Sequence, residues 1–273
     1  MVKLFSLGWL LCLTVYANPI ENMAASFMGE ASYSSQRNLV RILFSDSSSF
    51  IDPIDGSPNA VKVLQTLKEN GLLKLFYPET KALQLTFAVQ EHPVLFMRII
   101  NESLQAMGYS YYLTRNISQN ESGLVWVIGI ATQHLVDPVL LARQIQSRGA
   151  RVQTVVKESE IAWYYAIDAH EAKPKVEPHD LNTTITLGKP IQPYWINVSE
   201  ASRMTLRAQL ADKWFPQVVF FDATLNIIEE IRMEESRVRL QIAIPQNAMY
   251  GKVEDRYSLD NIKRGLNLYL ESR

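Results

Sequence analysis

The four histidines are the side chains best suited to bind a transition metal or to exchange protons near neutral pH. They are His92, His134, His170 and His179, and they lie far apart in the sequence. No two of them have the spacing of a helical metal pair such as His-Glu-x-x-His. His170 and His179 share a polar segment with acidic residues, where a weak surface metal site is an alternative to ordinary solvated side chains. We favour solvated side chains and predict no metal site.

Motifs for covalent or acid–base catalysis are missing from the sequence. It contains no Gly-x-Ser-x-Gly and no Ser-x-x-Lys with its partner motifs, and its one cysteine, Cys12, lies near the start. The acidic pairs 229–230 and 234–235 could suggest the two carboxylates of a glycosidase. Neighbours on a strand point to opposite faces, however, so neither pair could flank one scissile bond. We therefore predict no catalytic residue and no cofactor, and expect that the protein is not an enzyme.

Aromatic residues of the C-terminal region are better candidates for binding. Tyr194, Trp195 and Trp214 lie near the ends of expected strands. Exposed tryptophans on a β-sandwich can stack on sugar rings, although burial in the core is the commoner fate of this residue. We name these three residues as possible contacts for a glycan or a protein partner.

Tyr112 and Tyr164 form a second aromatic pair, which we expect on one face of a sheet. Such a face can stack nucleic-acid bases if its surroundings are basic. The chain carries 27 basic and 28 acidic side chains, and this balance argues against a nucleic-acid partner. The favoured interpretation is that N-terminal helices in residues 22–72 cover this face; the alternative is an open surface that contacts a partner.

One glycosylation motif differs from the others. The triplet Asn-x-Ser/Thr begins at five positions, but only Asn182 also has an acidic residue, Asp180, two positions before it. This extended pattern is typical of bacterial acceptor sites. Asn182 is therefore the candidate glycosylation site.

Residues 81–168 show the pattern of an α+β domain. Alternating strands are expected at 83–89 and 124–130, each followed by a helix that begins at Pro93 or Asp137. A strand over 109–114 and a polar turn over 116–123 join the two units. Strands over 151–156 and 161–167 should pair with each other. This order indicates a ferredoxin-like, split βαβ sandwich.

The remaining regions flank this domain. Residues 18–80 are expected to be a helical N-terminal region, with Ser57 as a helix cap. Residues 169–183 are polar, contain two prolines and read as a linker. Residues 184–273 contain short apolar runs separated by turn residues, and a short helical turn near Leu259. This spacing favours an all-β sandwich or jelly-roll domain.

Residues 1–17 have the features of a cleavable signal peptide. Lys3 precedes an apolar run of about 12 residues that is too short to span a bilayer, and Val-Tyr-Ala predicts cleavage between Ala17 and Asn18. A lipoprotein signal ending at Cys12 is a less favoured alternative, because Leu11 before it is not small.

These features together predict an exported protein of the periplasm without a transmembrane anchor. The outer cell surface is the alternative location. We expect a structural or adaptor module that contacts other envelope proteins. The alternative is a protein that binds peptidoglycan or another glycan through the C-terminal tryptophans.

Overall fold

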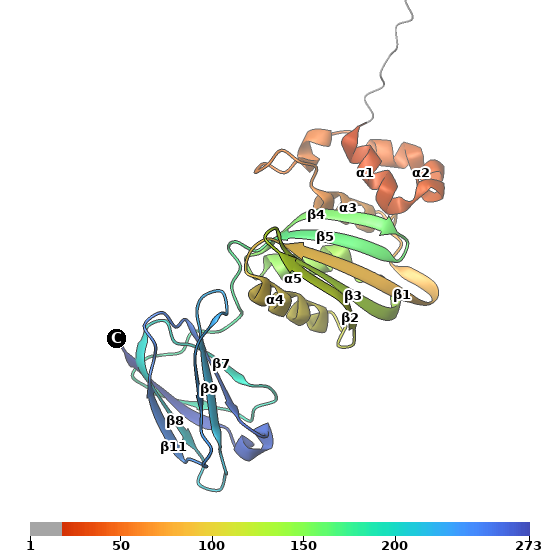
Figure 1. Cartoon of the computed structure of the whole chain (residues 1–273). Helices are drawn as coiled ribbons and strands as arrows, with labels where there is room; N and C mark the ends of the chain where they lie inside the picture. The colour runs from red at the N-terminus through yellow and green to blue at the C-terminus, as the bar shows by residue number, and fades with distance from the viewer. Residues whose placement is uncertain (1–17) are drawn as a thin grey trace, which may run out of the picture.

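The computed structural model describes residues 18–273, so the predicted signal peptide and Ala17 lie outside the described residues. Within this range the chain has a mixed α+β architecture of helices and three sheets (Figure 1). None of the helices between residues 18 and 273 is long and apolar enough to cross a membrane.

The N-terminal region is helical, as predicted. Its elements are α1 (Pro19–Met28), α2 (Glu30–Leu43), a 3-10 turn (Ser47–Phe50) and α3 (Ala60–Glu69). Asn18 caps α1, because its side-chain oxygen accepts a hydrogen bond from the Ile20 N–H at 3.0 Å. The cap of α3 is Asn59 and not Ser57, which corrects the sequence-based expectation. The reason is that Pro58 is held in an isolated bridge with Ile51 and so precedes the helix.

A five-stranded sheet follows, with the order β2-β3-β1-β5-β4. Its strands are β1 (Phe76–Val89), β2 (Leu113–Asn120), β3 (Gly123–His134), β4 (Arg151–Ser159) and β5 (Ala162–Asp168). Helix α4 (Pro93–Ala106) connects β1 to β2, and α5 (Pro138–Gln146) connects β3 to β4. The predicted pairing of the last two strands is confirmed, since β4 and β5 are antiparallel neighbours.

The strand beside β1 is β5, and the two run parallel. A four-stranded split βαβ sheet would instead place the strand after the second helix, here β4, at this position. The burial of the two strands explains the difference. Trp163, Tyr165 and Ile167 of β5 are all buried, whereas Val155 is the one fully buried residue of β4. The more apolar strand therefore takes the central position.

The second strand of the sheet lies further along the chain than predicted. It starts at Leu113 and runs through Asn120, so the predicted strand over 109–114 and the predicted turn over 116–123 are wrong in position. All eight residues of β2 are exposed, and β2 is an edge strand of the sheet. A polar composition is compatible with such an edge strand.

All described helices that contact this sheet pack on the same face. Phe27 of α1 stacks on Trp163 with ring centroids 5.8 Å apart, while Phe96 of α4 packs against Phe87, which also contacts Tyr165. In Figure 1 α4 and α5 lie behind the sheet and the N-terminal helices lie beyond β4. The expectation that the N-terminal helices cover the face carrying Tyr164 is therefore wrong. They instead extend the existing helical layer, through contacts of α3 with α5 and β4.

Residues 184–272 contain two four-stranded sheets with the orders β10-β9-β12-β7 and β11-β8-β13-β6. The strands are β6 (Thr184–Leu187), β7 (Tyr194–Asn197), β8 (Ala201–Ala208), β9 (Pro216–Phe221), β10 (Ile227–Arg232), β11 (Arg239–Ala243), β12 (Tyr250–Asp255) and β13 (Leu266–Ser272). A 3-10 turn spans Leu259–Ile262, where a helical turn was predicted. Buried residues of both sheets share one apolar core, as in a sandwich.

Candidate functional site

Trp214 is not available for binding. Its side chain is 0% exposed, and its indole N–H donates a hydrogen bond to the Glu254 carbonyl at 3.2 Å. A sugar ring could not reach it in the folded protein.

Trp195 and Tyr194 lie on β7, where the two halves of the protein meet. The N-terminal half is residues 18–168, with the helices and the five-stranded sheet, and the C-terminal half is residues 184–273, with the two four-stranded sheets. The guanidinium carbon of Arg98, on α4, lies 3.7 Å from the centre of the Trp195 ring. Phe221 contacts the same tryptophan with ring centroids 5.1 Å apart. The Tyr194 hydroxyl donates to the Gly188 carbonyl at 2.5 Å, and burial raises the pKa of Tyr194 to about 12. Trp195 therefore connects α4 to the second half of the chain.

A cleft of about 700 Å³ lies beside Trp195. Glu102 in the wall of this cleft forms ion pairs with Arg98 Nε at 2.7 Å and with Arg148 Nη2 at 2.9 Å. Lys175 and Lys189 add two further positive charges, and Glu177 adds one negative charge. Basic side chains therefore exceed acidic ones in this lining, which suits an anionic ligand.

Tyr112 and Tyr164 lie on opposite faces of the five-stranded sheet. The Tyr112 hydroxyl donates to Asn101 Oδ1 of α4 at 2.8 Å, and its ring packs edge-on against Trp126. Tyr112 thus belongs to the helix-covered side. Tyr164 is half-buried on the other face, so the structure does not bring these two residues together.

The face that carries Tyr164 has no described helix over it (Figure 1). Val127, Thr86, Tyr164 and Val156 form one row across β3, β1, β5 and β4, as the strand register requires. Val156 is 43% exposed. Arg115 lies across the same face next to Gly129, where an added Cβ would come within 2.7 Å of its Nε. An open row that presents two valines and a tyrosine is a candidate protein contact surface.

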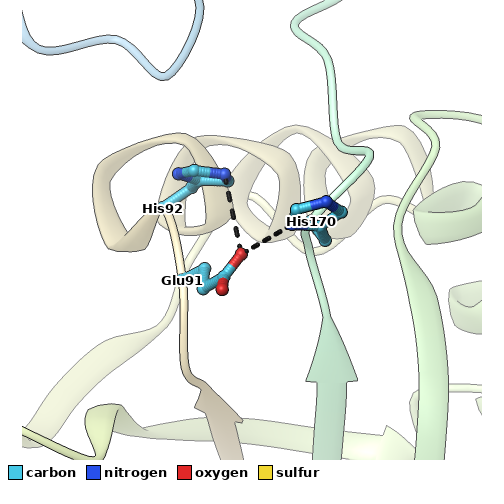
Figure 2. Close-up of side chains that lie close together, drawn as sticks. All are labelled: Glu91, His92 and His170. Atoms are coloured by element: carbon cyan, nitrogen blue, oxygen red, sulfur yellow. Dashed lines mark hydrogen bonds and ion pairs between the residues drawn. The ribbon is translucent and has the colours of Figure 1, made fainter.

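Glu91, His92 and His170 form a cluster at one end of this sheet (Figure 2). Glu91 Oε2 lies 2.9 Å from His170 Nδ1 and 3.9 Å from His92 Nε2. The hydrogen bond to Glu91 raises the pKa of His170, and the charges of Glu91 and Glu171 add to this effect. Of the side chains in residues 18–273, these three are grouped closely enough to share a metal ion.

The sequence alone did not indicate this cluster, because His170 lies 79 positions after Glu91 and 78 after His92. The parallel pairing of Val89 with Ile167 places the residues that follow β1 and β5 at the same edge. A prediction of this parallel pair would have put Glu91 and His92 beside His170. Of His170 and His179, the linker histidines weighed as a less favoured alternative, only His170 belongs to the cluster.

Asn182 is exposed but docked on the last strand. Its backbone N–H donates to the Leu270 carbonyl at 2.7 Å, and its side-chain Nδ2 donates to Ser272 Oγ at 3.1 Å. The nitrogen that a glycan would modify is therefore engaged in a hydrogen bond. Glycosylation of Asn182 stays a prediction, and it would require release of this contact or modification before folding.

No protein-family model, curated protein or solved structure matches this chain. Inference about its role therefore starts from the surfaces described above.

Proposed function

We propose that the protein is an exported, non-enzymatic adaptor or structural module of a cell-envelope assembly, located in the periplasm. The observation that carries this proposal is the open face of the five-stranded sheet, defined by Val127, Thr86, Tyr164 and Val156. The side chains of two valines and a tyrosine lie in one row there with Thr86, where water contact with the apolar groups is unfavourable and a partner could bury them.

The fold supports the same interpretation by analogy. We interpret the five-stranded sheet as a ferredoxin-like sandwich with one inserted strand, and the C-terminal sheets as a sandwich of jelly-roll type. Small α+β domains and β-sandwiches are both common as binding modules, although fold alone does not define function.

Site-specific photo-cross-linking tests the adaptor role. A photoreactive amino acid is placed at Thr86 or Val156 in cells of the source organism, and at Leu210, which is 91% exposed in the C-terminal half, as a control. We expect one envelope protein to be captured at both sheet positions and not at position 210. Recovery of the uncross-linked protein alone from both sheet positions would contradict the proposal, as would its absence from the periplasmic fraction.

The cleft beside Trp195 favours a second candidate function, the binding of an anionic glycan such as a peptidoglycan fragment. Its support is the excess of basic side chains around Glu102, with Arg98 and Arg148 on either side. The ring of Trp195 is already in contact with Arg98, so charge would contribute more to binding than stacking.

Tryptophan fluorescence tests this second candidate. Trp126, Trp163 and Trp214 are at most 3% exposed, so a change on titration with peptidoglycan fragments would report on Trp195. We expect a saturable change that is lost in Trp195→Phe and weakened in Arg148→Ala. A flat titration with the unmodified protein would exclude this candidate.

A further inference from the structure

The cluster of Glu91, His92 and His170 has the composition of a transition-metal site. Two imidazoles and one carboxylate form a ligand set typical of Zn²⁺, which leaves one position for water. In a tetrahedral site with metal–ligand bonds of about 2.0–2.2 Å, the ligand atoms lie roughly 3.3–3.6 Å apart.

In the cluster, one distance between ligand atoms is shorter than this tetrahedral range and another is longer. Glu91 Oε2 is 2.9 Å from His170 Nδ1 and 3.9 Å from His92 Nε2, and all three ligand atoms lie within 4.8 Å of one another. An ion between them would replace the hydrogen bond of Glu91 to His170. Side-chain rotations of this size are available, because the side chains of Glu91 and His170 are 55% and 69% exposed.

The backbone places the ligands before any ion binds. Glu91 and His170 follow the ends of two paired parallel strands, as Figure 2 shows. His92 has a φ of 54°, in the left-handed region that residues other than glycine seldom adopt. It is fixed there between β1 and Pro93, the first residue of α4.

The charges around the cluster favour a cation. Glu171 Oε1 lies 3.8 Å from His170 Nε2, and Asp168 lies near the same strand end. The charge of Asp168 is partly offset by Arg151, which pairs with both Asp168 and Asp52. A small pocket of about 190 Å³, also lined by Gln90 and Gln153, lies beside Glu91 and His170 and has room for a water ligand.

We propose that Glu91, His92 and His170 bind a divalent transition-metal ion of borderline softness, represented by Zn²⁺. The bound ion would join the β1–α4 junction to the segment that leaves β5 toward the C-terminal sheets. This inference does not depend on the adaptor role or on the cleft beside Trp195.

Calorimetric titration of the purified protein with Zn²⁺ tests the proposal. The protein carries no polyhistidine tag and is first treated with a chelator. We expect one equivalent of Zn²⁺ to bind, and Co²⁺ at the same site to give the visible absorption of a low-symmetry, four- or five-coordinate complex.

Single substitutions then locate the site. His170→Ala, His92→Asn and Glu91→Gln should each weaken Zn²⁺ binding more than about tenfold. Asparagine is used at position 92 because it tolerates left-handed backbone and so preserves the fold. His134→Ala and His179→Ala are matched controls that should bind like the unmodified protein.

Circular dichroism spectra establish that each variant is folded. The absence of one-to-one binding in the unmodified protein would overturn the proposal. Binding that survives His170→Ala, or that is lost in His179→Ala or His134→Ala, would also overturn it.

Discussion

At the scale of single residues, the buried polar groups of this protein serve the fold. Asp255 is 6% exposed. Its carboxylate accepts hydrogen bonds from the backbone N–H groups of Phe215, Tyr257 and Ser258 and from the side chain of Asn261, at 2.7–2.9 Å. A buried carboxylate with four donors stabilises the loop around it.

We therefore expect Asp255→Ala to destabilise the protein. The substitution leaves several buried N–H donors without a partner, which should reduce the free energy of unfolding by about 2–4 kcal/mol. Asp260→Ala, at an exposed position five residues away, is the control and should change it by less than about 0.5 kcal/mol. Urea denaturation measures both, and equal midpoints for the two variants would contradict this role of Asp255.

Tyr77 should make stability depend on alkaline pH. Its hydroxyl donates to the Glu160 carbonyl at 2.8 Å, and burial, with a contribution from the charge of Glu160, raises the pKa of Tyr77 to about 12. The unfolded chain releases this proton near pH 10, whereas the folded protein retains it to about pH 12. The unfolded state thus binds fewer protons in this window, and the free energy of unfolding falls as the pH rises through it.

The predicted size of this Tyr77 effect is about 2 kcal/mol between pH 10 and pH 12. Tyr77→Phe should show a smaller decrease over the same interval, because phenylalanine has no proton to release. Denaturation at pH 10 and pH 12 compares the two proteins. An identical pH dependence would show that ionisation of Tyr77 does not contribute.

At the scale of elements, close approach between strands and turns restricts which residues the chain can use. Gly123 begins β3 after the hairpin from β2 and has a φ of +117°. A Cβ at this position would lie 2.1 Å from the Val89 carbonyl oxygen, at the end of β1. Glycine is required here both by the backbone angle and by the packing of the hairpin on β1.

We expect Gly123→Ala to reduce the free energy of unfolding by more than about 2 kcal/mol, since it combines an unfavourable backbone angle with a backbone clash. Gly188→Ala is a suitable control because no heavy atom lies within 4 Å of its added Cβ. Hydrogen exchange should show the loss of protection concentrated at the end of β1 and the start of β3. Similar stability of both variants would contradict the clash.

At the scale of the whole molecule, Arg98 holds the two halves together. Its guanidinium stacks on Trp195 and also pairs with Glu102 through Nε at 2.7 Å. Tyr250 and Leu225 of the C-terminal half belong to the same apolar cluster as the five-stranded sheet. The contact therefore combines a desolvated cation–π interaction with apolar burial.

Arg98→Ala should loosen this arrangement at a cost of up to about 2 kcal/mol. We expect a larger radius of gyration by small-angle X-ray scattering and faster proteolysis between residues 173 and 183. Arg203→Ala removes an exposed ion pair with Glu271 and serves as the control. If the scattering and proteolysis of Arg98→Ala match those of Arg203→Ala, the cation–π contact does not hold the two halves.

The sequence alone determined the α+β class, the helical N-terminal region and the all-β character of the chain after residue 184. These features follow from hydrophobic periodicity, which is a property of neighbouring residues and can be read without knowing their distant contacts. The edge strand β2 was misplaced because exposed strands carry no such periodicity.

Only the tertiary structure decided which strands pair and which faces are covered. The parallel pairing of β1 with β5 brought Glu91 and His92 to His170, and packing of α1 on Trp163 left the face of Tyr164 open. The contact of Arg98 with Trp195 likewise joins residues almost one hundred positions apart. Such pairings depend on competition among many apolar surfaces for burial, so no local pattern in the sequence specifies them.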